Sequence, residues 1–126
     1  MKIDKKSIIE VYTDGASRGN PGLAGAGVFI SFTSPPSSHF LSVFLGKKTN
    51  NEAEYLALFL AARHLSKLLE LKPQTTEPEG SQLRFYMDSK LVVEQMSGNW
   101  KIKNPRMHNL AGLCHEEIEN LGFRVE

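Results

Sequence analysis

The sequence has little of what disulfide-stabilised, membrane-spanning or strongly charged proteins require. Its single cysteine, Cys114, excludes an internal disulfide framework and a cysteine-rich zinc site. No apolar run approaches the roughly 20 residues of a membrane-spanning helix, and residues 1–4 lead into no signal-peptide core. The net charge of +1 indicates no general affinity for polyanions, so any such surface must be a local patch. We expect a cytoplasmic protein in which Cys114 is a buried helix residue.

The chain has 126 residues, of which 40% are hydrophobic and 23% charged, as is ordinary for one globular domain over residues 1–126. Alternating apolar and β-branched residues predict strands at residues 8–14, 25–32, 38–46, 82–88 and 122–126. Three- and four-residue apolar spacing predicts helices at residues 51–71, 89–98 and 105–120. This order predicts an α/β fold with a five-stranded mixed sheet flanked by helices. The first strand should be central, with the fourth and fifth parallel to it.

The segments between and within these elements allow finer expectations. Residues 33–37 contain two prolines and should join the second and third strands as a hairpin loop without ladder bonds. A polar stretch at residues 72–80 should link the first helix to the fourth strand. The first helix is apolar nearly all round in its first half, which predicts packing on more than one side. The last helix should bury Met107, Leu110, Leu113, Cys114 and Ile118.

The first strand leads directly into Asp14, and Gly15 should begin a turn. Alternation places Tyr12 and Asp14 on one face of the strand, with Val11 and Thr13 on the other. The end of a buried strand is a costly place for a carboxylate unless a partner such as a metal ion compensates. Alone, the pattern is explained more simply by an aspartate that opens an Asp-Gly turn.

The fourth strand repeats this design and ends at Asp88. Because parallel neighbours end at the same edge of a sheet, Asp14 and Asp88 should lie at adjacent carboxyl ends, where open α/β sheets bind ligands.

The start of the long helix contains two overlapping capping boxes, Thr49 with Glu52 or Asn51 with Glu54. Acidic residues in a first turn also complement the helix dipole. We interpret Glu52 as a structural cap.

Several short motifs follow one another along nearly the whole chain. The motifs are Tyr12-Thr13-Asp14-Gly15, Gly19-Asn20-Pro21-Gly22, Thr49-Asn50-Asn51-Glu52-Ala53-Glu54 and Met87-Asp88-Ser89. Together they resemble type 1 ribonuclease H, a family that cleaves the RNA strand of RNA–DNA hybrids with divalent metal ions. Each alone is weakly specific, but the ordered set is highly specific. The short link from Gly98 to Pro105 resembles the versions without a basic helical handle found in archaea and many bacteria.

The resemblance implies that the catalytic and metal-binding carboxylates are Asp14, Glu54 and Asp88. The catalytic glutamate is the last residue of the family pattern Thr-Asn-Asn-x-x-Glu, which is Glu54 here and not Glu52. Three carboxylates within about 5 Å repel pairwise by roughly 3 kcal/mol at an effective dielectric near 20, so such a group suits a cation. All-oxygen ligands favour Mg²⁺, for which Mn²⁺ can substitute, and two ions suit phosphodiester hydrolysis. The implied products carry 5′-phosphate and 3′-hydroxyl ends.

Selection of a hybrid depends on 2′-hydroxyl groups and groove shape, because base sequence is not read. Thr49 matches a family position that contacts a DNA-strand phosphate. The remaining expected contacts are Gly15, Ser17, Asn20, Asn50 and Asn51. These residues could equally serve only in turns and caps.

The only cluster of aromatic and basic residues is formed by Trp100, Lys101, Lys103, Arg106 and His108. Surface lysines are usually only solvated. An exposed tryptophan with interleaved lysines after a helix break favours contact with a nucleic-acid backbone, which positions a duplex and carries no sequence code.

The chain departs from the family pattern at two places. In the family a fourth acidic residue, a mobile histidine and a closing helix follow the fifth strand, whereas this chain ends at Glu126. Lys90 stands where many members carry a glutamine. We expect weaker catalysis or a shift towards Mn²⁺. We also expect an uncovered sheet edge at the C-terminal end, which favours self-association.

Three functional hypotheses are compared for this sequence. The leading hypothesis is a metal-dependent endoribonuclease that acts on RNA–DNA hybrids. The alternative is a catalytically weak or inactive binding module, although a pure binder has no reason to keep the mutually repelling Asp14, Glu54 and Asp88. A nuclease for DNA junctions is disfavoured by the Thr49-Asn50-Asn51 motif. Fold alone separates none of these, so the site must decide.

Overall fold

The structure is a computed structural model that describes residues 7–69 and 82–121. Its helices and strands are β1 (Ile8–Arg18), β2 (Gly22–Thr33), β3 (Pro36–Lys48), α1 (Asn50–Leu69), β4 (Gln82–Met87), α2 (Lys90–Met96) and α3 (Pro105–Asn120). The predicted fifth strand at residues 122–126 and the link at residues 72–80 lie outside the described residues.

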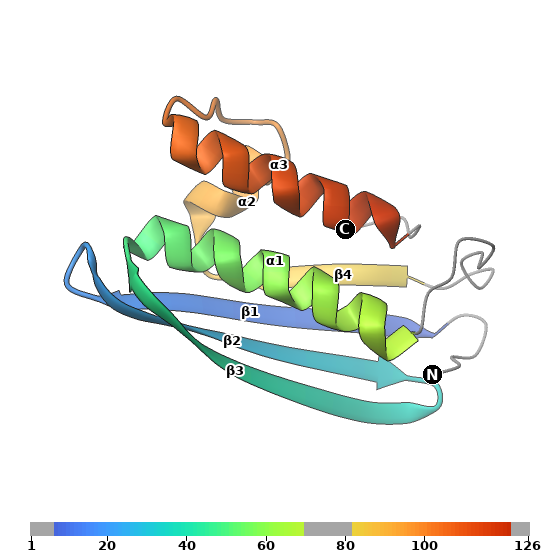
Figure 1. Ribbon diagram of the computed structural model, residues 1–126. Helices are drawn as coiled ribbons and strands as arrows, with labels where there is room; N and C mark the ends of the chain where they lie inside the picture. Colours follow the sequence, from blue (N-terminus) through green and yellow to red (C-terminus); the bar gives the residue numbers. More distant parts are fainter. Residues whose placement is uncertain (1–6, 70–81, 122–126) are drawn as a thin grey trace.

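The strands form a mixed sheet in the order β3-β2-β1-β4 (Figure 1). β1 pairs antiparallel with β2, and β2 pairs antiparallel with β3. β4 returns after α1 to lie parallel to β1, so β1 is an interior strand of the described sheet. The predicted α/β fold, the hairpin and the parallel fourth strand are therefore confirmed.

The hairpin between β2 and β3 is tighter than its sequence suggested. Thr33 and Pro36 are register partners, and only Ser34 and Pro35 form the turn. The prediction that residues 33–37 carry no ladder pairing is wrong. Pro36 is tolerated because it is the first residue of β3, where a missing backbone donor costs little.

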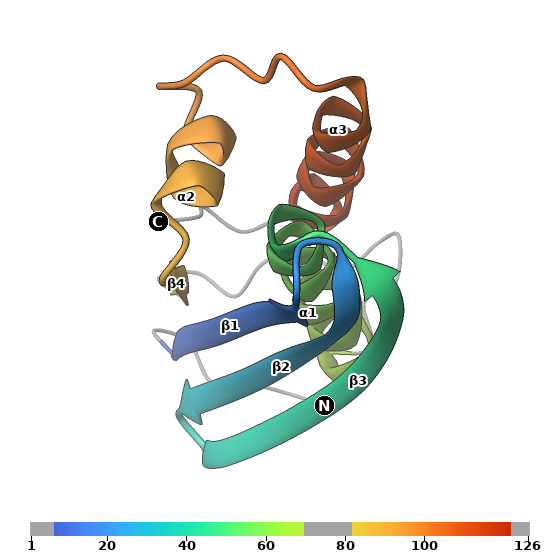
Figure 2. The ribbon, with the colours of Figure 1, turned by 90° about the vertical axis from the view of Figure 1, so that its left-hand side faces the viewer.

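The helices lie in layers on one face of the sheet. α1 covers β1 and β2, and α3 packs on the far side of α1, next to α2 (Figures 1 and 2). α1 is therefore buried on two sides, as its sequence predicted. None of the described helices combines the length and the hydrophobicity needed to cross a bilayer.

Two apolar clusters form the core of the described residues. The first lies between the sheet and α1, and the second joins α1 to α2 and α3. The first contains Ile9, Val11, Val28, Ile30, Phe32, Ala61, Ala62, Leu65, Leu69, Leu83 and Leu121. The second contains Tyr55, Leu58, Val92, Met107, Ala111 and Cys114.

α3 begins where the Asn104 side chain accepts hydrogen bonds from the backbone N–H groups of Arg106 and Met107. Cys114 is fully buried, as predicted, and burial raises the pKa of its thiol to about 12. The prediction that Leu113 is buried is wrong, because its side chain is 48% exposed. Leu113 precedes the buried Cys114, and successive helix residues point about 100° apart, so the Leu113 side chain turns away from α1.

The opposite face of the sheet carries an aromatic row, defined as Tyr86, Tyr12, Phe29 and Phe40. These four residues are register partners across all four described strands. Tyr12 and Tyr86 stack with ring centroids 4.9 Å apart. The exposed fractions run from 39% at Tyr86 to 71% at Phe40. This face of the described sheet therefore carries exposed aromatic side chains. The uncovered C-terminal edge and the self-association expected from it stay predictions.

Candidate active site

The carboxyl ends of β1 and β4 meet the N-terminal ends of α1 and α3 at one end of the molecule, on the left in Figure 1. Thr13 and Met87 are parallel register partners. Asp14 and Asp88 are the next residues of their strands and are both exposed. The predicted adjacency of these two aspartates at one sheet edge therefore follows from the observed register.

The chain makes no turn at Asp14, which corrects the expectation from the sequence. β1 continues to Arg18, with Asp14 paired to Gly27 of β2, and the turn occupies residues 19–21. Gly15 serves a different purpose, because α1 approaches its backbone directly. A Cβ at Gly15 would lie 2.5 Å from the Glu54 backbone nitrogen and closer still to the Ala53 carbonyl oxygen. The glycine lets the helix bring Glu54 beside Asp14.

Glu54 is held close to both aspartates in a nearly buried position. It is 6% exposed, and its Oε2 atom has no hydrogen-bond partner. Burial, together with the charges of Asp14 and Asp88, raises the pKa of Glu54 to about 7. The backbone N–H of Gly15 opposes this rise. The described residues thus supply too few hydrogen bonds and positive charges to stabilise the ionised form of the Glu54 carboxylate.

The three carboxylates do not converge as tightly as expected. Among residues 7–69 and 82–121, no three Asp, Glu, His or Cys side chains gather closely enough to hold an ion. The orphaned Glu54 oxygen, opposed by two exposed aspartates, still fits a hard divalent cation, which takes oxygen ligands.

The first turn of α1 forms one of the two predicted capping boxes. The Thr49 N–H donates to Glu52 Oε1 at 2.9 Å, and the Glu52 N–H donates to Thr49 Oγ1 at 3.1 Å. These bonds lower the pKa of Glu52, assisted by the nearby charge of Arg106. The structural interpretation of Glu52 is confirmed. Its ion pair with Arg106, at 3.6 Å, was not visible in the sequence because it joins different helices.

The expected contacts in the β1–β2 turn and at the start of α1 form one network. The Asn50 N–H donates to Asn20 Oδ1 at 3.0 Å, and the Ser17 N–H donates to Asn50 Oδ1 at 3.2 Å. The Ser17 hydroxyl lies within hydrogen-bond distance of the carbonyl oxygens of Gly19 and Lys48 and can donate its one proton to either. The structure thus brings together residues that lie far apart in the sequence. Gly15 and Asn51 flank this network, Gly15 in β1 and Asn51 in the first turn of α1.

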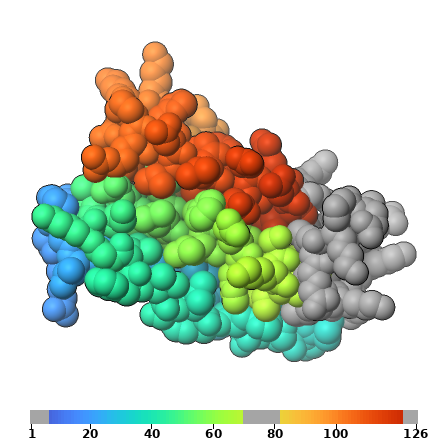
Figure 3. Space-filling model, in the orientation of Figure 1, coloured from blue at the N-terminus to red at the C-terminus, as the bar shows by residue number. Residues whose placement is uncertain are grey.

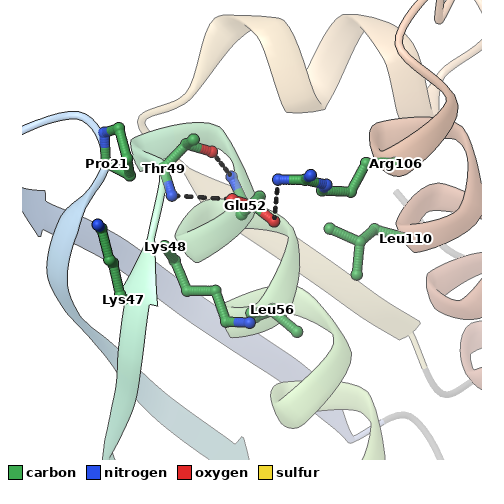
Figure 4. Close-up of a pocket in the computed structure, with 8 residues that line it drawn as sticks. All are labelled: Pro21, Lys47, Lys48, Thr49, Glu52, Leu56, Arg106 and Leu110. Atoms are coloured by element: carbon green, nitrogen blue, oxygen red, sulfur yellow. Dashed lines mark hydrogen bonds and ion pairs between the residues drawn. The ribbon is translucent and has the colours of Figure 1, made fainter.

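A groove runs between the N-terminal ends of α1 and α3. A cavity of about 560 Å³ is lined by Pro21, Lys47, Lys48, Thr49, Glu52, Leu56, Arg106 and Leu110 (Figure 4). A second cavity of about 250 Å³ shares Thr49, Glu52 and Arg106 with it and adds Asn20, Asn51 and Asn104. Sequence reasoning missed Lys47 and Lys48 here. Their position directly before Thr49 was the available signal.

The predicted aromatic and basic cluster is divided between the link from α2 to α3, which carries Trp100, Lys101 and Lys103, and the start of α3, which carries Arg106 and His108. Trp100 is 44% exposed, and Lys101 and Lys103 are exposed with it. Lys90, the departure from the family pattern, places its Nζ 5.9 Å from the Trp100 ring centroid. In Figure 3 this part of the chain, in orange, projects from the surface above α1.

Two hydrogen bonds in series connect α1 to the α2–α3 link through Gln95 of α2. The Tyr55 hydroxyl donates to Gln95 Oε1 at 2.5 Å, and Gln95 Nε2 donates to the Lys101 carbonyl at 3.4 Å. Tyr55 is fully buried, so the anchor belongs to the core, and burial raises its pKa to about 12. Because Tyr55 directly follows Glu54 in α1, the position of the link depends on core packing next to Glu54.

Comparison with known proteins agrees with this geometry. The RNase H family matches residues 5–121 of the chain. A bifunctional protein of Mycobacterium tuberculosis, Rv2228c, is 40% identical over 107 residues, which is 83% of this chain and 26% of that protein. A ribonuclease H of Bartonella bacilliformis is 33% identical over 121 residues, covering 92% of this chain and 68% of that enzyme. The chain thus spans about a quarter of the mycobacterial relative.

A solved structure provides the corresponding match in three dimensions. LC11-RNase H1 in complex with an RNA/DNA hybrid is 35% identical, with a TM-score of 0.71 over 94% of this chain and 84% of that chain. The α/β architecture described above is therefore a ribonuclease H-like fold. Since the family match spans nearly all of the described residues, the chain belongs to the RNase H family.

Proposed function

We propose that this chain hydrolyses the RNA strand of RNA–DNA hybrids, with two divalent metal ions held by Asp14, Glu54 and Asp88. The observation that carries the proposal is the nearly buried Glu54, whose Oε2 has no partner and whose pKa is raised first by burial and then by both aspartates. A binding surface gains nothing from such a destabilising arrangement. A cation would relieve it.

Mg²⁺, with Mn²⁺ as a substitute, would activate water and stabilise the leaving oxygen in an in-line displacement. The protein contributes three oxygen donors from separate elements, β1, α1 and the end of β4. Asp14 and Asp88 are exposed and can face a duplex, whereas Glu54 closes the site from the helix side. The proposed products carry 5′-phosphate ends.

The network at the start of α1 is suited to recognise the RNA sugar edge. Amide and hydroxyl groups of Ser17, Asn20 and Asn50 are already oriented by their mutual hydrogen bonds. Asn51, next to Asn50 in the first turn of α1, would contribute a side-chain amide, and Gly15 lies two residues before Ser17 in β1. Such groups can both donate to and accept from a 2′-hydroxyl, which distinguishes RNA from DNA.

The DNA strand would lie along the groove and the α2–α3 link. Thr49 stands in the groove beside Lys47 and Lys48, which suits a phosphate contact. Trp100, Lys101 and Lys103 would hold the backbone farther along, because the Tyr55–Gln95 hydrogen bond fixes the position of their link. These contacts position the duplex without reading its sequence.

A cleavage experiment with strand-specific labels tests this function. With the RNA strand and then the DNA strand of a hybrid labelled, we expect Mg²⁺-dependent cutting of RNA alone. The fragments should become substrates for a 5′-phosphate-dependent exonuclease. Double-stranded RNA and double-stranded DNA should remain intact. Hybrid binding without cutting, in Mg²⁺ or Mn²⁺, would support the inactive binding module instead.

A further inference from the structure

One ion pair spans the groove between the N-terminal ends of α1 and α3. Arg106 Nη1 lies 3.6 Å from Glu52 Oε2, and Figure 4 shows the arginine reaching from α3 towards the glutamate on α1. The other carboxylate oxygen of Glu52 accepts the Thr49 N–H. The Glu52 carboxylate therefore contacts both Thr49, the proposed phosphate contact, and the guanidinium of Arg106.

The two partners of this pair are held very differently. The Glu52 side chain is 10% exposed and is fixed by two hydrogen bonds with Thr49. The Arg106 side chain is 71% exposed, and exposed ion pairs contribute little. A guanidinium binds a phosphate through two parallel, charge-assisted hydrogen bonds. Arg106 can therefore leave Glu52 for a phosphate, whereas Glu52 cannot follow it.

The groove has the composition of a phosphate site around this pair. Lys47 and Lys48 line it on the β3 side, and the N-terminal ends of α1 and α3, where helix dipoles are positive, lie at the same end of the molecule (Figure 1). Leu56 and Leu110 form an apolar part of its lining. Glu52 is the acidic residue of this lining, so it competes with an entering anion for Arg106.

We propose that Arg106 exchanges Glu52 for a backbone phosphate when a hybrid enters the groove. Glu52 is a positioning residue that keeps Arg106 at the groove in the free protein. This inference rests on the proposed function, because it assigns a substrate group to the same surface. Removing the charge of Glu52 should therefore strengthen binding, whereas removing Arg106 should weaken it.

The test is hybrid affinity measured by fluorescence anisotropy in the Asp14→Asn background with a chelator, where no cutting occurs. Glu52→Gln keeps an oxygen that can accept the Thr49 N–H, so the cap is preserved. We expect Glu52→Gln to lower the Kd on the order of fivefold. Arg106→Gln should raise the Kd by a similar factor. It should also reduce the slope of log Kd against log salt concentration by about 0.9.

A second ion pair provides a matched control. Arg63 and Glu117 also join α1 to α3, at 3.8 Å, but lie roughly 16 Å farther along α1. Arg63→Gln should leave both the Kd and the salt slope unchanged. In the double variant Glu52→Gln/Arg106→Gln, the gain from Glu52→Gln should disappear, since no arginine is left to release.

A purely structural cap predicts a different pattern. Glu52→Gln would then have the same small effect with or without Arg106, and Arg106→Gln would leave the salt slope unchanged. Either result overturns the exchange while hybrid cleavage by the wild-type chain still supports the proposed function. If the chain neither binds nor cuts the hybrid, both proposals fall together.

Discussion

Replacing Gly15 with alanine should damage the catalytic geometry without touching a carboxylate. The new methyl group would lie 2.5 Å from the Glu54 backbone nitrogen and closer to the Ala53 carbonyl oxygen. Both obstacles are backbone atoms of α1, which cannot rotate away as a side chain could. The helix must shift away from β1, and Glu54 must shift with it.

The size of the effect follows from overpacking. Inserting a methyl group into a close contact typically costs about 1–3 kcal/mol, and a rigid backbone neighbour favours the upper half of that range. For a domain of this size such a loss lowers the melting temperature by on the order of 10 °C. A displacement of about 1 Å at a reacting group can reduce the rate by about 100-fold. Activity should therefore fall further than stability explains.

Gly27 provides the control for stability. It lies opposite Asp14 on β2, and a Cβ there meets nothing within 4 Å. Gly27→Ala should change the free energy of unfolding by less than about 0.5 kcal/mol in urea titration. Thermal unfolding and hybrid cleavage at a temperature well below both transitions would compare the two variants. A Gly15→Ala chain with wild-type melting temperature and wild-type rate would contradict the close contact between β1 and α1.

Further predictions concern charge, anchoring and the open sheet face. Without metal, folded Glu54 keeps its proton up to a pKa of about 7, whereas unfolded Glu54 ionises near 4.5. The free energy of unfolding should therefore fall from pH 4.5 to 7 and then level off, and Glu54→Gln should flatten this part of a urea-unfolding profile. Mg²⁺ should raise the melting temperature of the wild-type chain at pH 8 and hardly that of Glu54→Gln; equal shifts would contradict a metal site at Glu54. Tyr55→Phe removes the bond to Gln95 and should cost about 0.5–1.5 kcal/mol in urea unfolding, with weaker hybrid binding in anisotropy. The exposed aromatic row should promote self-association, which Phe40→Ser should reduce in size-exclusion chromatography with light scattering. A wild-type chain that stays monomeric at high concentration would contradict this last prediction.

Local signals were sufficient to predict the elements that form the site. Alternation and the two aspartates at the ends of their apolar runs predicted that β1 and β4 are parallel neighbours, and their observed register agrees. The Thr49–Glu52 capping box was legible because helix starts use side chains three residues apart. The placement of Glu54 came from the family resemblance, since its acidic neighbours lie on other elements.

Other features depend on contacts that no short stretch contains. Gly15 looked like the start of a turn, because the approach of α1 to β1 is a tertiary event. The exposure of Leu113 depends on which flank of α3 faces α1, and the Glu52–Arg106 pair depends on how the two helices meet.

The most direct test of the central claim compares the wild-type chain with Asp14→Asn on a labelled RNA–DNA hybrid in Mg²⁺ and, separately, in Mn²⁺. Asp14 is exposed beside Gly27, so an isosteric amide should leave the fold intact, which circular dichroism can verify. We predict that the wild-type chain cuts only the RNA strand and that Asp14→Asn binds the hybrid but does not cut it. Equal cutting by both chains would contradict a site built on Asp14, Glu54 and Asp88. If the wild-type chain binds the hybrid but cuts it in neither metal, the proposed enzymatic activity is contradicted.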